Sequence, residues 1–349
     1  MSDLVKTQSA YRSLGDSPPD AKRRRLMLLC GLTLAGYGSS GVARAAAATP
    51  LRLALLSDND LFEDGKVQME SLRRGLAQLG YEEGKNLVIE RRNAKRDKQA
   101  FALHTSELVE WKPDMFVAAS TTAAFSLQKE TLKSRTPVVF WSTDPVESGI
   151  VASLERPGAN LTGVTDPSDT QQTVLDAMQS IVPGLKKVGL FYNATYAPAP
   201  ATLAELRNAA KPREIEIVVY DIPLDVEQFD DRAAAIKADA IEAAVVGPHP
   251  YFNMNGARIG SALLNHGIVG ASITRSVLQA GGVITVTPDF ATIWQDAAQS
   301  IGKILKGADP ATLPVVRSRN LLLLNHKSAA ALGRELPEAL LKRADQVLK

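Results

Sequence analysis

From residue 51 onward, short apolar segments alternate with segments whose apolar residues recur at helical spacing. Leu51–Ser57 and Met115–Ala119 have the composition of buried strands, and residues 65–79 carry their apolar side chains on one face of a helix. The same alternation restarts after Gly163 and continues to about residue 270. Because strands that alternate with helices form βαβ units, we expect an α/β fold built on mainly parallel sheets.

Length, charge and composition narrow the classes of function. A chain of 349 residues exceeds one average domain and suits two lobes of about 150 residues each. The formal net charge of +2 leaves no basic footprint for nucleic acid, so we expect no nucleic-acid partner. The four histidines lack HxH or HxxxH spacing, and no phosphate-binding loop or nucleophile-elbow motif follows a strand. We therefore predict no metal site, no cofactor and no catalytic residues.

The N-terminal segment has the three parts of a secretory signal peptide. The basic run Lys22–Arg25 precedes the apolar run Leu26–Gly36, and an Ala-x-Ala site lies within Ala43–Ala48. We predict that residues 1–47 are a leader and signal peptide, removed on export to the periplasm by the Sec or the twin-arginine route. Cys30 lies in the apolar run, so the exported chain would contain no cysteine. An uncleaved membrane anchor is the alternative, although the run is short for a bilayer.

Three blocks of sequence carry a family resemblance. The segment Pro137–Val164 joins an apolar strand, a polar turn, a short helix, a Pro-Gly turn and a second strand, and two further blocks follow in order at residues 281–315 and 331–347. All three resemble the patterns of exported ABC-transporter substrate-binding proteins of the tryptophan and tyrosine type. Ile150 and Ala159 are mild departures from the first pattern. The resemblance covers nearly the whole chain after the leader.

This resemblance implies the type I periplasmic-binding-protein fold, in which two Rossmann-like lobes with parallel sheets are joined by a three-segment hinge. The crossings would fall near Thr162–Gly163, near Val283–Val286 and near Val315–Arg317. The predicted composition of the lobes is residues 50–163 plus 285–314 for lobe one, and residues 164–284 plus 315–349 for lobe two. A ligand would be enclosed between the lobes, which would close on it by a hinge motion.

The candidate ligand-binding residues follow from the same fold. Parallel α/β sheets bind ligands at the carboxyl ends of their strands and at the first turns of the following helices. In lobe one these positions are Asp58, Asn59, Ser120, Thr121, Thr122 and Asp144. At the crossings and in lobe two they are Thr165, Asp166, Asn193, Tyr196, His249, Tyr251 and Asp289. The hydroxyls of Ser120–Thr122 suit a carboxylate, aspartate side chains suit an ammonium group, and Tyr196 would stack on a flat ligand.

Several of these residues also fit purely structural roles. Ser120 and Asp144 each precede a predicted helix and would act as N-caps, with Pro145 at a first helical position. The loop at Asp58 would then be a solvated turn, and the proline-rich loop that contains His249 would be a rigid surface loop. Both interpretations remain open at this point.

The resemblance implies a receptor that binds a small-molecule solute and delivers it to an inner-membrane ABC permease. The expected solute is an amino acid or a related small carboxylate, aromatic in typical members of the family. Asp58, Asp60 and His249 would also suit a cationic or hydroxylated solute. We expect a monomer without enzymatic activity. The alternatives are a periplasmic ligand-sensing module for a signalling partner and an exported hydrolase or isomerase that uses His249.

Overall fold

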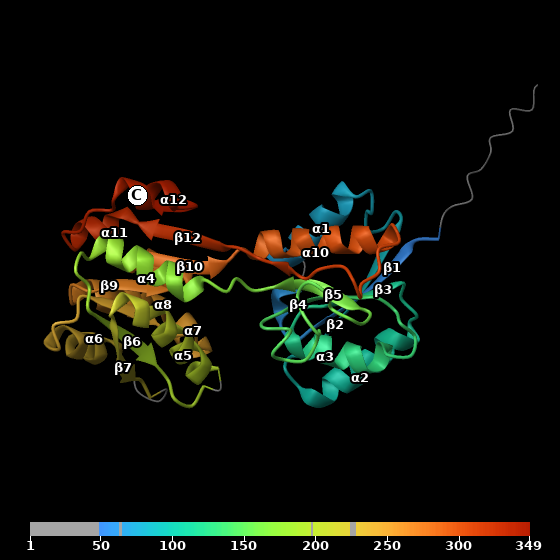
Figure 1. The fold of residues 1–349 in the computed structure, drawn as a ribbon, viewed down its shortest axis with the longest axis horizontal. Coiled ribbons are helices and arrows are strands. Elements are labelled where there is room, and N and C mark those ends of the chain that lie inside the picture. The colour runs from blue at the N-terminus through green and yellow to red at the C-terminus, as the bar shows by residue number, and fades with distance from the viewer. Residues whose placement is uncertain (1–48, 63–64, 197, 224–227) are drawn as a thin grey trace, which may run out of the picture. The chain divides into compact units, whose positions relative to one another are not determined.

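The structure is a computed structural model that describes residues 49–62, 65–196, 198–223 and 228–349. The described chain forms two β-sheets, each covered by helices on both faces (Figure 1). We call each sheet with its helices a lobe, numbered in chain order. The predicted signal peptide lies outside the described residues. Within them, no helix combines the length and apolar character needed to span a membrane.

Lobe one is built on a six-stranded sheet in the order β11-β5-β4-β3-β1-β2, and all of its strand pairs are parallel. Its strands are β1 (Leu51–Ser57), β2 (Leu87–Asn93), β3 (Met115–Ala118), β4 (Val138–Ser142), β5 (Leu161–Thr165) and β11 (Val316–Arg317). The strands β1, β3 and β5 are buried along almost their whole length. Such continuous apolar runs are expected where helices cover both faces of a parallel sheet.

Two helices cover each face of this sheet. On one face lie α1 (Val67–Gln78) and α10 (Phe290–Leu305), and on the other α2 (Lys98–Glu110) and α3 (Thr121–Thr131); the short 3₁₀ helix η1 (Asp60–Phe62) precedes α1. Trp294 of α10 is fully buried, and its ring meets that of Phe62 edge to face with the centroids 4.4 Å apart. Helix α10, although distant in sequence, therefore completes the core of lobe one.

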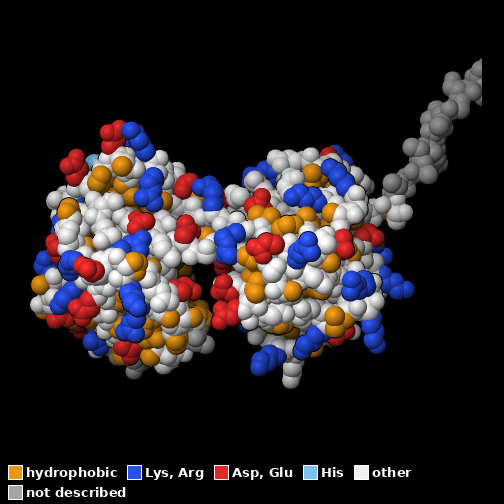
Figure 2. Space-filling model, in the orientation of Figure 1, with side chains coloured by type: hydrophobic (Ala, Val, Ile, Leu, Met, Phe, Trp, Pro, Cys, Tyr) orange, Lys and Arg blue, Asp and Glu red, His pale blue; other side chains and the backbone are white. Residues whose placement is uncertain are grey.

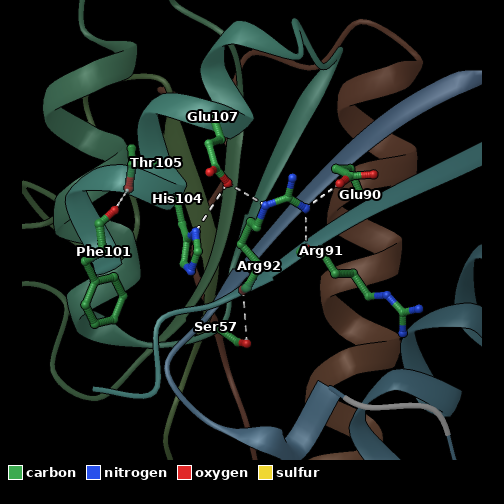
Figure 3. A network of polar contacts seen from close by, with 8 residues as sticks. All are labelled: Ser57, Glu90, Arg91, Arg92, Phe101, His104, Thr105 and Glu107. Atoms are coloured by element: carbon green, nitrogen blue, oxygen red, sulfur yellow. Dashed lines mark hydrogen bonds and ion pairs between the residues drawn. The ribbon is translucent and has the colours of Figure 1, made fainter. Parts of the chain in front are cut away.

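A network of charged side chains fastens α2 to the edge strand β2 (Figure 3). The Nε of Arg92 donates to Glu107 over 2.7 Å, and the same guanidinium pairs with Glu90. The Nδ1 of His104 lies 3.3 Å from the Glu107 carboxylate. The hydrogen bonds from Arg92 and then from His104 hold the pKa of Glu107 below its usual range. The network thus links the edge strand of the sheet to its covering helix.

Lobe two is built on a seven-stranded sheet in the order β13-β12-β10-β9-β8-β6-β7. The β10–β12 pair is antiparallel, and the other pairs are parallel. Its strands are β6 (Lys187–Tyr192), β7 (Glu216–Asp221), β8 (Ala243–Val246), β9 (Val269–Ser272), β10 (Ile284–Pro288), β12 (Asn320–Asn325) and β13 (Gln346–Leu348). The predicted α/β class with two mainly parallel sheets is confirmed.

Helices again cover both faces of this sheet. One face carries α4 (Thr170–Ile181), α5 (Ala199–Ala210), α11 (His326–Ala331) and α12 (Glu338–Arg343). The other carries α6 (Phe229–Ala238), α7 (Pro250–Met254), α8 (Gly256–Asn265) and α9 (Arg275–Gln279). The 3₁₀ helix η2 (Lys211–Arg213) extends the end of α5.

The chain passes between the two sheets three times. The passages follow Thr165 at the end of β5, Pro288 at the end of β10 and Arg317 at the end of β11. The first two lie just after the expected points, because β5 and β10 continue beyond Gly163 and Val286, and the third begins at the end of the expected range. At the second and third passages, Arg319 pairs with Asp289 over 2.9 Å and with Asp345 over 2.7 Å. These ion pairs tie two crossing segments to the C-terminal part of lobe two.

Two local predictions were wrong. No helix follows Asp144; residues 145–149 form a turn, and Asp144 itself has a left-handed backbone with φ of 44°. The residue pattern of 338–347 predicts one helix, but the observed helix ends at Arg343, because residues 346–348 pair as β13 with β12. Strand pairing between distant segments overrides the local helical pattern in the second case.

Gly163 generates a stability prediction. A Cβ at this position would collide with the backbone carbonyl of Phe140 on the neighbouring strand β4. We expect Gly163→Ala to lower the free energy of unfolding by roughly 1–3 kcal/mol or more, as for other overpacked cores. Gly189→Ala is the matched control on β6, since its Cβ would lie 3.1 Å from the movable Cδ1 of Ile236. Urea unfolding measures both changes, and equal losses would contradict the prediction.

Candidate ligand-binding site

A cleft of about 410 Å³ is lined by residues of both lobes. Lobe one contributes the turn after β4 and the residue after β5, and lobe two contributes the first turn of α4, one face of α5 and the ends of β9 and β10. The lining residues are Thr143, Asp144, Asp166, Pro167, Ser168, Thr170, Gln171, Gln172, Glu205, Asn208, Ile273 and Pro288. The cleft therefore lies at the carboxyl ends of parallel strands, where α/β folds bind ligands.

Asp166 is the most firmly oriented acidic group of the cleft. It follows β5, and its Oδ1 accepts a hydrogen bond of 2.7 Å from the indole Nε1 of Trp141. Its Oδ2 accepts a second one, also of 2.7 Å, from the hydroxyl of Thr143. Burial raises the pKa of Asp166, and the two hydrogen bonds oppose this shift while the nearby charge of Asp144 adds to it. Two donors thus orient the carboxylate, while its burial disfavours the charged form.

The first turn of α4 offers the cleft a partial positive charge. Asp169 occupies the N-cap position, but its side chain does not cap the helix. Its Oδ1 instead accepts a hydrogen bond of 2.9 Å from the amide of Asn320 across the third crossing. No side chain caps the first N–H groups of α4, and Thr170, Gln171 and Gln172 of this turn line the cleft. This arrangement suits a carboxylate.

Acidic groups of the two lobes face each other across the cleft. Glu205 lies on α5 with an exposed side chain, and its pKa is raised first by partial desolvation and then by the charges of Asp144 and Glu147 on lobe one. The space-filling view shows acidic side chains along the margin of lobe one that borders this cleft (Figure 2). The twelve lining residues include three carboxylates and no lysine, arginine or histidine. The charged side chains that line the cleft are therefore all acidic.

The predicted residues at the start of α3 make internal contacts. Ser120 is buried and caps α3, with its Oγ accepting from the N–H of Ala123 over 3.2 Å. The hydroxyl of Thr121 lies 2.9 Å from that of Ser142, and Thr122 is exposed. The structural role foreseen for Ser120 is present, whereas none of the three residues lines the cleft of Asp166.

Asp58 and Asn59 lie at the ends of β1 and β2, apart from the cleft. The Nδ2 of Asn59 donates to Asp58 over 2.7 Å. Asn59 lines a separate hollow of about 390 Å³, together with Arg91, Arg92 and Asn93. The edge position of β2 accounts for this separation, since β4 and β5 lie on the other side of β3 and β1.

The polar groups after β6 and β8 in lobe two hold their own loops. Asn193 is buried, donates to the carbonyl of Ile222 over 2.7 Å and accepts from the N–H of Thr195 over 3.1 Å. His249 caps α7 through its Nδ1, which accepts from the N–H of Tyr251 over 2.9 Å, and burial lowers the pKa of this imidazole. The ring of Tyr196 meets that of His249 edge to face at 4.8 Å between centroids. The cleft is not lined by any of the four predicted residues Asn193, Tyr196, His249 and Tyr251.

Two predicted residues hold the crossings. Asp289 caps α10 by accepting from the N–H of Thr292 over 3.2 Å, and it pairs with Arg319 of the third crossing. Thr165 is buried at the end of β5, in register with Ser142 of β4. Both residues shape the hinge next to the cleft without lining it.

Of the thirteen sequence-predicted residues, the structure brings Asp144 and Asp166 together in the cleft. Sequence reasoning missed the first turn of α4 and the residues Glu205 and Asn208 of α5. The first turn of α4 could have been predicted from the sequence, because the first crossing leads directly into that helix. Glu205 carries no comparable signal, since a lone glutamate on an amphipathic helix resembles any solvent-facing residue.

Comparisons with known proteins show what the chain is similar to. The family model described as "ABC transporter substrate binding protein" matches residues 64–348. A curated tyrosine-binding protein of Clostridioides difficile (strain R20291) is 32% identical over 155 residues, which are 44% of this chain and 44% of that protein. The chain is thus aligned with less than half the length of this relative.

Two solved structures share the fold. The ligand-free, open structure of a substrate binding protein with adhesive properties from Clostridium difficile has a TM-score of 0.72 and 19% identity, covering 86% of this chain and 100% of that one. An ABC domain from Streptococcus pneumonia in complex with L-Trp has a TM-score of 0.67 and 24% identity, with the same coverage. The family match over residues 64–348, together with the expected two-lobe fold, confirms the resemblance: this chain belongs to the family of ABC transporter substrate binding proteins.

Proposed function

We propose that this protein is an exported receptor that binds an amino acid in the cleft between its lobes and delivers it to an inner-membrane ABC permease. The observation that carries the proposal is the cleft at the carboxyl ends of β4 and β5 in a chain of this family. The names of a tyrosine-binding relative and of an L-Trp complex support an amino acid as the class of ligand. Binding rather than catalysis is its task, and it acts as a periplasmic monomer.

The cleft offers complementary groups for the two charges of an amino acid. The α-carboxylate would accept hydrogen bonds from the uncapped first turn of α4, near Thr170 and Gln171. The α-ammonium would contact Asp166, whose two oxygens are already oriented by Trp141 and Thr143. Carboxylate oxygens retain free lone pairs after one hydrogen bond each, so Asp166 still accepts from a ligand.

A thermal-shift screen of the chain from residue 48 onward, which forms one compact unit, tests the proposal. An amino acid at 100 times its dissociation constant should add about 2.7 kcal/mol to the free energy of unfolding. Asp166→Ala should abolish the shift for the same compound. Asp58→Asn is the matched control, because Asp58 does not line the cleft and the shift should persist. The absence of any shift across the amino acids and small carboxylates would refute this function.

The pH dependence of binding gives a second prediction. Because burial raises the pKa of Asp166, this group takes up a proton at pH values at which an exposed aspartate is still ionised. Protonation removes the charge that holds the ammonium group, so affinity should fall on acidification from neutral pH, before exposed aspartates titrate. Asp166→Asn should bind more weakly at neutral pH and lose this part of the pH dependence. Isothermal titration at a series of pH values provides the measurement, and an identical profile for both proteins would contradict the assignment.

A further inference from the structure

The charges of the cleft exceed what a zwitterionic ligand would neutralise. Asp144 and Asp166 come from lobe one and Glu205 from lobe two, and the lining includes no basic side chain. Within the described chain, none of the three forms an ion pair with a basic residue. Arg317, the guanidinium that does contact Asp166, donates to its backbone oxygen over 3.3 Å and leaves the carboxylate unpaired. Asp166 is half-buried, whereas the side chains of Asp144 and Glu205 are exposed in the open cleft. Closing the lobes over three such carboxylates without a cationic partner would be costly.

The position of Glu205 separates two parts of the cleft. Asp166 and the start of α4 lie at the first crossing, whereas Glu205 lies on α5 beside Asn208. A ligand whose α-carboxylate and α-ammonium bind at α4 and Asp166 would extend its side chain toward Glu205. Glu205 is exposed to the cleft, and the lining supplies no basic side chain to pair with it. The end of the ligand side chain that meets Glu205 should therefore carry positive charge. Partial desolvation and then the charges of Asp144 and Glu147 raise the pKa of Glu205, in keeping with an acidic group that has no cationic partner.

The other residues that line the cleft also disfavour a ligand with a flat aromatic side chain. The apolar contributions are Pro167, Ile273 and Pro288, and none of the lining residues is aromatic. The aromatic rings of lobe two, including Tyr196 and Tyr251, gather around His249 outside this cleft. At about 410 Å³, the cleft is within the range of 300–1,000 Å³ typical of small-molecule sites.

We infer that the solute is an amino acid with a cationic side chain, whose ammonium or guanidinium group binds Glu205 of lobe two while its α-ammonium binds Asp166 of lobe one. The inference rests on the proposed function, since it assigns the ligand of the same cleft. It differs from the aromatic solute that the family resemblance implies. The paired lobes would close on a ligand that bridges carboxylates from both sides.

Isothermal titration with matched pairs of ligands tests the inference. L-arginine and L-citrulline have similar shapes but differ in charge, as do L-lysine and L-norleucine. We expect the cationic member of at least one pair to bind roughly tenfold more tightly or better, as is typical for a hydrogen bond to a charged group. Added salt should reduce this difference. L-tyrosine and L-tryptophan, tested alongside, should bind more weakly than the preferred cation.

Substitutions then locate the cation. Glu205→Gln should remove most of the preference for the cationic member of the pair while retaining weak binding of both. Glu216→Gln is the control, because Glu216 is exposed on β7 and does not line the cleft. If a neutral amino acid binds as tightly as its cationic partner, or if Glu205→Gln leaves the preference intact, the inference fails while the proposed function stands. If no amino acid binds the folded protein, the proposed function fails and the inference falls with it.

Discussion

The hydrogen bond between the indole of Trp141 and the carboxylate of Asp166 connects the core of lobe one to the cleft. The indole that donates to Asp166 also packs edge to face on Phe290 and Trp294 of α10, with centroids 5.6 and 6.4 Å away. Helix α10 begins directly after the second crossing, and Asp289 at its N-cap pairs with Arg319 of the third. Under the proposed function, a ligand bound at Asp166 would be separated from the core of lobe one by one side chain, and two crossings border the Trp141–Asp166 contact.

The same hydrogen bond also explains how an acidic group is kept in a half-enclosed position. Burial disfavours the ionised form of Asp166, and donors from Trp141 and Thr143 recover part of the lost solvation. Those donors leave the net charge unchanged, so the carboxylate still attracts a cation. A lysine or arginine at Trp141 would instead neutralise Asp166 and remove this attraction. Neutral donors therefore orient the carboxylate and leave its negative charge unpaired.

The fold was accessible from sequence because its determinants are local. Buried strands such as β1 and β3 are short apolar runs, and their alternation with amphipathic helices indicates parallel sheets without any knowledge of tertiary contacts. Asp144 and Asp166, which both line the cleft, were predicted as binding residues for the same reason, since both follow strands that end at one edge of a sheet. Strand β13 was missed because it exists only through pairing with β12. The sequence of this segment alone is equally compatible with a helix.

The sequence did not show which of the other predicted residues line the cleft and which make structural contacts instead. Ser120, Asn193, His249 and Asp289 occupy ligand-type positions, yet each of these side chains caps a helix or holds its own loop. A polar residue after a strand fits both roles, and only the contacts of its side chain distinguish them. Glu205 presents the opposite case. No sequence motif marks Glu205, and it becomes a candidate for ligand contact only because acidic groups of lobe one lie near it across the cleft.

This opposition of like charges bears on how the lobes would close. Bringing Glu205 toward Asp144 and Glu147 raises their mutual repulsion as water leaves the cleft, because the effective dielectric constant falls. An empty cleft would therefore resist closure, and a zwitterion would relieve only the part near Asp166. A ligand with a second positive charge converts the repulsion into attraction on both sides. The stability of the closed state relative to the open state would then depend on the charge of the ligand. A ligand shifts a conformational equilibrium only when it binds one of the two states more tightly. Selectivity and closure would thus have one electrostatic origin.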